Sequence, residues 1–117
     1  MNIEKLAAEI KKKKSELTKI VSDISKIMFI YNMNLKDDHK YSVEFNIGAS
    51  GNMIEIRVYE EDELIYDKSQ YGISSFFNHW SYYSFQDYDN NRILQLKNDL
   101  LEMKRVVIKY TKLDLIH

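Results

Sequence analysis

The sequence predicts a single α+β domain with a long N-terminal helix, a three-stranded antiparallel meander, a short helix and a long C-terminal helix. Apolar residues recur at helical spacing near both ends of the chain, and apolar and polar residues alternate in its middle. The 117 residues leave room for one hydrophobic core. The lack of proline, of a low-complexity linker and of an internal repeat also favours one compact unit.

The first helix is predicted by a stripe of apolar residues at alternating spacings of three and four. Its members are Ile3, Leu6, Ile10, Leu17, Ile20, Ile24, Ile27 and Tyr31. Lys13 interrupts the stripe in the first half, whereas the apolar face is wider in the second half, where it gains Val21, Met28, Phe29 and Ile30. We therefore expect the second half to pack on the core. Residues 1–16 can project as a helical arm, and their narrow seam favours pairing with a partner helix or, in a homodimer, with a second copy.

The middle of the chain has the alternation of half-buried strands, with turn residues between them. Tyr41, Val43, Phe45 and Ile47 alternate with polar residues, and Ile54, Ile56 and Val58 do so after Gly48 and Gly51. The prediction is a polar loop over residues 32–40 and then strands over 41–47, 54–59 and 64–70, with residues 60–63 as the second connection.

Two further helices are predicted after the meander. Residues Ile73, Phe76, Phe77 and Trp80 have the spacing of a short amphipathic helix. Asp87 or Asp89 can cap the last helix, whose apolar stripe again follows the heptad spacing. That stripe comprises Ile93, Leu96, Leu100, Met103, Val107 and Tyr110.

The net charge of −1 conceals an acidic middle, because residues 41–91 carry nine acids against Arg57 and Lys68. This segment sums to −7, whereas residues 1–40 and 92–117 each sum to +3. Acids gather at strand edges and turns in many proteins, so a solvated surface is one interpretation. A functional acidic face is the other, and it would bind a basic partner. Its densest part is Glu60, Glu61, Asp62 and Glu63.

No residue pattern predicts catalysis, and we expect neither a cofactor nor a metal. The chain lacks cysteine and a glycine-rich phosphate loop. His39 lies beside Asp37 and Asp38, but no second histidine has a metal-ligand spacing. The lack of cysteine is typical of a reducing compartment, and no apolar run is long enough to span a membrane. We therefore expect a non-enzymatic protein of the bacterial cytoplasm.

Residues 71–88 hold eight aromatic side chains, which are candidates for either core packing or recognition. Phe76, Phe77 and Trp80 favour core packing. The tyrosines Tyr82, Tyr83 and Tyr88 lie in a connection, where rings with a polar tip serve as interface anchors or stack on a base. Asn91 and Arg92 follow closely and complete the residue types of a nucleotide pocket.

Several strings of residues resemble the small listerial anti-CRISPR proteins that inhibit the RNA-guided nuclease of type II systems. They are MNIEKLAAEIKKK at the start, the strands YSVEF and IEIRV, then ISSFFNHW and QDYDNN before the last helix. The resemblance covers most residues from 41 to about 100 and includes the order of helices and strands, whereas the first helix of this chain is much longer. It implies an acidic surface that imitates DNA and occupies the arginine-bearing site with which the nuclease reads its short recognition motif.

The resemblance implies that residues 60–63 form an acidic strand loop and that Asp87 and Asp89 precede the last helix, where the family has a denser run of acids. This chain has Asn90, Asn91 and Arg92 there instead. The leading hypothesis is a phage-type inhibitor of a bacterial defence protein, with residues 60–63, Tyr82, Tyr83, Asp87, Tyr88 and Asp89 as contacts. The alternatives are an oligomer that sequesters a nucleotide signal through Asn91 and Arg92, and a structural dimer.

Overall fold

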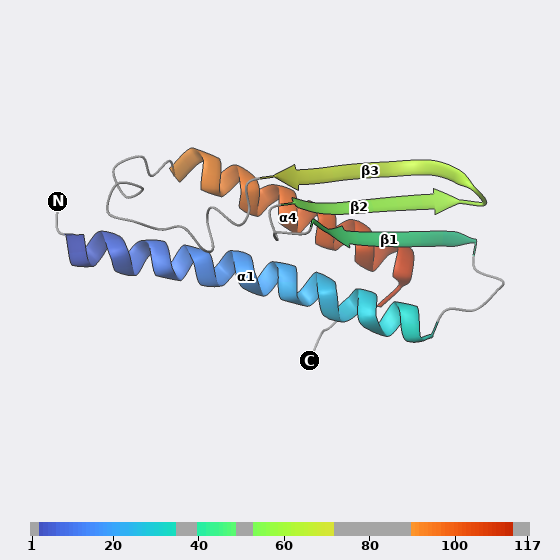
Figure 1. The fold of residues 1–117 in the computed structure, drawn as a ribbon, viewed down its shortest axis with the longest axis horizontal. Helices are drawn as coiled ribbons and strands as arrows, with labels where there is room; N and C mark the ends of the chain where they lie inside the picture. The colour runs from blue at the N-terminus through green and yellow to red at the C-terminus, as the bar shows by residue number, and fades with distance from the viewer. Residues whose placement is uncertain (1–2, 35–39, 49–52, 72–89, 114–117) are drawn as a thin grey trace.

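The computed structural model describes residues 3–34, 40–48, 53–71 and 90–113 of the chain (Figure 1). The elements are α1 (Ile3–Met33), β1 (Tyr41–Ile47), β2 (Met53–Glu60), β3 (Glu63–Tyr71) and α4 (Asn90–Thr111). The predicted α+β fold is confirmed, with a long helix at each end of a three-stranded antiparallel sheet. The short helix predicted over residues 73–80 lies outside the described residues.

The sheet is a meander in the order β1-β2-β3, and one of its faces forms part of the core. Strand β1 pairs with β2 in a register that aligns Val43 with Val58 and Phe45 with Ile56. These side chains share one face because side chains alternate across a strand. Val43, Ile54, Ile56 and Val58 are all buried there. The opposite face therefore carries the polar residues of the alternating pattern.

Helices α1 and α4 pack against each other in the same direction. Lys97 Nζ donates to Glu16 Oε2 at 3.2 Å, and Lys104 Nζ donates to Asp23 Oδ2 at 3.1 Å, so both ion pairs join residues 81 positions apart. A constant separation arises only when two helices run parallel, and Figure 1 shows both running along the sheet in one direction. Each helix contributes partners seven residues apart, as parallel heptad packing requires.

The heptad stripes predicted from the sequence meet at this contact. The buried stripe residues are Leu17, Ile20, Ile24, Ile27 and Tyr31 of α1 and Leu96, Leu100, Met103 and Val107 of α4. Met28 is buried beside the α1 stripe, whereas Phe29 and Ile30 are exposed, so the prediction that these two widen the core-facing side was wrong. Helix α4 also contacts all three strands, so it joins α1 to the sheet. The side chains of Ile3, Leu6 and Ile10 are outside the described part, and the arm of residues 1–16 stays a prediction.

A buried carboxylate lies within the helix contact. Asp23 is 8% exposed, and its Oδ2 accepts hydrogen bonds from Lys104 and from Lys19, the latter at 3.1 Å. Burial acts to raise the pKa of Asp23, but the two ammonium groups outweigh it and hold that pKa below its ordinary value. The charged form of Asp23 is therefore the form that the fold stabilises.

We predict that Asp23→Asn lowers the free energy of unfolding by about 1–3 kcal/mol at pH 7, because charge-assisted hydrogen bonds to both lysines are lost. A carboxylate with a depressed pKa stabilises the fold above its unfolded pKa near 4 and ceases to do so as the pH falls through its folded pKa. Urea unfolding should thus show a difference in the free energy of unfolding between the parent and the variant at pH 7, and a smaller difference well below pH 4.

The control is Glu9→Gln, which removes an exposed ion pair with Lys13 and should change stability little at either pH. An Asp23→Asn variant as stable as the parent at pH 7 would contradict the account.

Candidate functional site

The acidic residues 60–63, named here the acidic turn, connect β2 to β3 at one end of the sheet (Figure 1). Glu60 pairs with Glu63, so only Glu61 and Asp62 form the turn itself, which is tighter than the four-residue connection predicted. Their φ angles are +50° and +77°. Two positive φ angles define a type I′ hairpin turn, which asparagine and glycine normally occupy. A glutamate and an aspartate in this conformation are strained.

Contacts to the start of β1 hold the acidic turn in place. The Glu61 amide donates to the Lys40 carbonyl oxygen at 3.2 Å, and Lys40 Nζ forms an ion pair with Glu60 Oε1 at 3.1 Å. The same ammonium lies 5.5 Å from the centroid of the Tyr41 ring. The hydrogen bond to Glu60 is the main cause of the raised pKa of Lys40. The turn therefore has a fixed position relative to β1.

A shallow pocket of about 370 Å³ lies between the acidic turn and the outer face of β1 and β2. Its lining combines carboxylates with an aromatic ring, and it consists of Lys40, Ser42, Glu44, Tyr59, Glu61 and Asp62. Because Lys40 is engaged with Glu60, three carboxylates of the lining lack a described ion-pair partner. Carboxylates beside an aromatic face suit an ammonium or guanidinium group. The pocket can thus receive a lysine or arginine side chain.

The acidic surface continues across the outer face of the sheet. Arg57 Nη2 lies 3.2 Å from Glu55 Oε2 and its Nε lies 3.6 Å from Asp67 Oδ1, while Glu44 pairs with Arg57 in the register of β1 and β2. Glu55 contributes most to the raised pKa of Arg57. We name the acidic turn together with Glu44, Glu55 and Asp67 the acidic face. Its carboxylates outnumber its neighbouring cations, Lys40 and Arg57.

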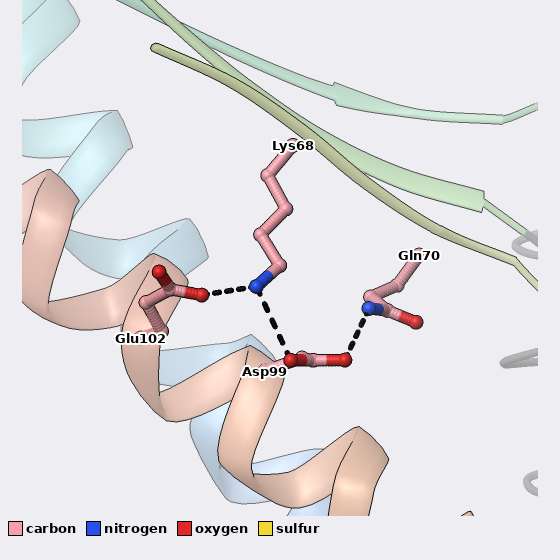
Figure 2. Close-up of polar contacts among 4 residues, drawn as sticks. All are labelled: Lys68, Gln70, Asp99 and Glu102. Atoms are coloured by element: carbon pink, nitrogen blue, oxygen red, sulfur yellow. Dashed lines mark hydrogen bonds and ion pairs between the residues drawn. The ribbon is translucent and has the colours of Figure 1, made fainter.

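A second polar cluster, which the sequence did not predict, joins the inner side of β3 to α4 (Figure 2). Lys68 Nζ donates to Asp99 Oδ1 at 3.2 Å and to the carboxylate of Glu102, and Gln70 Nε2 donates to Asp99 Oδ2 at 2.6 Å. The bond to Glu102 is the main cause of the raised pKa of Lys68. Burial, more than nearby Glu102, raises the pKa of Tyr66, whose hydroxyl has no described hydrogen-bond partner.

This cluster fastens the edge strand to the helix rather than forming a reactive site. The Lys68 ammonium and the two carboxylates satisfy one another, and Gln70 occupies a further carboxylate oxygen (Figure 2). Its sequence signal is the alternation of Tyr66, Lys68 and Gln70, which the apolar pair Leu64 and Ile65 obscures. The cluster fixes β3, and with it one side of the acidic face.

The structure thus brings together one of the two groups of predicted contact residues, the acidic turn. Tyr82, Tyr83, Asp87, Tyr88 and Asp89 lie outside the described residues. Asn91 and Arg92 belong to the first turn of α4, but their side chains are not among those described. The nucleotide pocket and the aromatic contact surface therefore stay predictions.

In the described part of the chain, no three histidine, cysteine, aspartate or glutamate side chains are placed to hold a metal ion. None of the described helices is long and apolar enough to cross a membrane. Comparison with models of known protein families, with curated proteins and with solved structures finds no significant match. The geometry and the charge of the protein are therefore the basis for a functional proposal.

We predict that replacing Glu61 with Asn and Asp62 with Gly raises the free energy of unfolding by about 1 kcal/mol, because asparagine and glycine tolerate positive φ. Urea unfolding measures the change. Alanine at both positions is the matched control, since it removes the same two charges and keeps the strain. Equal stabilisation by both pairs of substitutions would assign the effect to charge repulsion and contradict the strain.

Proposed function

We propose that this protein is an inhibitor that binds a bacterial nucleic-acid-targeting protein and covers its basic surface with the acidic face. The observation that carries the proposal is the acidic turn, which presents its carboxylates in a fixed conformation. Among the described residues, Glu61, Asp62 and Glu63 have no ion-pair partner. Their charge is thus available to a basic partner.

Electrostatics supports a partner that handles nucleic acid. Such proteins bind phosphates with surfaces rich in lysine and arginine. A surface of fixed carboxylates attracts those cations and steers the two proteins toward each other. This effect weakens as salt screens the charges. The pocket beside Tyr59 adds a place for one lysine or arginine side chain of the partner. Binding would exclude nucleic acid from the same surface.

Rigidity supports inhibition as well. A partner that binds a flexible acidic loop must also order it, which costs free energy. The hydrogen bond from the Glu61 amide to the Lys40 carbonyl oxygen and the ion pair between Lys40 and Glu60 hold the turn before the partner arrives. Positive φ angles at Glu61 and Asp62 cost folding free energy. A functional need for acids at these two positions explains why Asn and Gly do not occupy them.

The resemblance to anti-CRISPR proteins selects the first partner to test, an RNA-guided nuclease of a type II system. In this assignment the acidic turn is the counterpart of the family's acidic strand loop. The site that reads the short recognition motif uses arginines, to which an acidic surface is complementary in charge.

We predict that the protein co-elutes with a guide-loaded type II nuclease in size-exclusion chromatography and that target DNA added first prevents it. The triple variant Glu61→Gln, Asp62→Asn, Glu63→Gln should weaken binding about tenfold or more, which corresponds to roughly 1.4 kcal/mol. Rising salt should weaken the parent more than the variant. Titration at several salt concentrations measures both effects.

The control changes Glu4 and Glu9 of α1 to Gln, which removes two negative charges but leaves the acidic face and the ion pairs between α1 and α4 intact. An absence of co-elution would refute the nuclease as partner. Equal affinity of the triple variant and the parent would refute the acidic face as the contact surface.

A further inference from the structure

Helix α1 has a second apolar surface on the side away from the core. Phe29 is 67% exposed, Met33 is 71% exposed and Ile30 is 37% exposed, although Ile27 and Tyr31 in the same turns are buried. Phe29 and Met33 are four residues apart and therefore share one face of the helix. We name Phe29, Ile30 and Met33 the α1 outer face. Large exposed apolar side chains that adjoin one another mark an interaction surface.

A hollow of about 500 Å³ adjoins the α1 outer face. Its lining consists of Ser22, Ser25, Lys26, Phe29 and Ile30. The small serine side chains lie one and two turns before Phe29, so the surface has a recess next to a protruding ring. An occupant would place apolar side chains in the recess and against Phe29.

The charges around the hollow indicate which occupant fits. Lys26 is exposed, and no described carboxylate lies within ion-pair distance of it. Lys19, about two turns earlier, already donates to Asp23. The complementary surface is therefore apolar and carries a carboxylate. Direct packing of two α1 outer faces across a two-fold axis would instead bring two Lys26 side chains together.

The same chain carries a surface of the complementary kind beside the acidic turn. Leu64 is 47% exposed and Ile65 is 39% exposed, and both directly follow Glu63. The register shift between Val58 and Tyr59 leaves Ile65 without a partner on β2. Such a bulge redirects side chains, and here two successive apolar residues are exposed next to carboxylates. We name Glu63, Leu64 and Ile65 the hairpin strip.

The C-terminal end of α1 and the turn between β2 and β3 lie near the same end of the molecule (Figure 1). Tyr31 Oη donates to the Tyr41 carbonyl oxygen at 3.2 Å, which ties the end of α1 to the start of β1. The acidic turn is tied to the neighbouring Lys40 carbonyl oxygen. Two copies facing each other at this end can therefore exchange contacts reciprocally, and a two-fold axis closes the assembly.

We propose that the protein forms a two-fold homodimer in which the hairpin strip of each copy packs on the α1 outer face of the other. Leu64 and Ile65 fill the hollow against Phe29, and Glu63 forms an ion pair with Lys26 of the other copy. This inference concerns the protein alone and does not rest on the proposed function. Because the acidic turn adjoins the hairpin strip, the dimer and a complex with a basic partner exclude each other.

Light scattering on the purified protein over a wide concentration range tests the proposal first. The expected mass at high concentration is twice the chain mass of 14.0 kDa, and the double variant Phe29→Ser, Met33→Ser should give the single-chain mass. Leu94→Ser is the matched control, since Leu94 of α4 is 56% exposed and lies outside both surfaces. Circular dichroism confirms that each variant is folded. A parent that stays monomeric, or a dimer that survives the double variant, overturns the proposal.

A charge exchange then tests the pairing of Lys26 with Glu63. Lys26→Glu and Glu63→Lys should each shift the protein toward monomer, because like charges then face each other in both contacts. A mixture of the two variants should form a heterodimer, in which one contact is that of the parent and the other has both charges reversed. The double variant of one chain should dimerise again. If Lys26→Glu leaves the dimer as stable as that of the parent, Glu63 is not the partner of Lys26 and the proposal fails.

Discussion

The parallel contact between α1 and α4 is the constraint on which the rest of the structure depends. Helix α4 contacts α1 and all three strands, so it joins α1 to the sheet. The contact combines two heptad stripes with a carboxylate, Asp23, that bonds to a lysine on each helix. A buried charge is costly unless it is paired, and the hydrogen bond from Lys104 forms only when α4 has one register on α1. The apolar stripes supply the stability, and Asp23 and Glu16 select the alignment.

The start of β1 transmits this arrangement to the exposed surfaces. The Tyr41 carbonyl oxygen accepts a hydrogen bond from Tyr31 of α1, and the Tyr41 ring packs edge-on against Tyr110 of α4 with centroids 4.9 Å apart. The adjacent Lys40 holds the acidic turn through its carbonyl oxygen and its ammonium group. Both proposed binding surfaces therefore depend on one short stretch of chain. A change at this stretch would displace the acidic face and the hairpin strip together.

The sequence predicted the elements well because their periodicity is strong. The stripes from Leu17 to Tyr31 and from Leu96 to Val107 identified the buried faces of both helices, and alternation identified the strands. The direction of α4 was not predictable from these stripes, since a heptad stripe reads the same both ways. The acids at 16 and 23 and the lysines at 97 and 104 do not reveal it either, since their equal spacing of seven residues allows pairing in both directions. The type I′ turn was missed because residues 60–63 contain no glycine or asparagine.

The parallel register is tested most directly by the distances between spin labels attached to pairs of introduced cysteines. The chain has no cysteine of its own, so the labels are unambiguous. Lys12, Leu94 and Lys109 are exposed and suit labelling. The account predicts a short distance between positions 12 and 94 and a clearly longer one between positions 12 and 109, which are offset by about 22 Å along the helices at a rise of 1.5 Å per residue. A shorter distance for the pair 12 and 109 would show antiparallel helices and contradict the account.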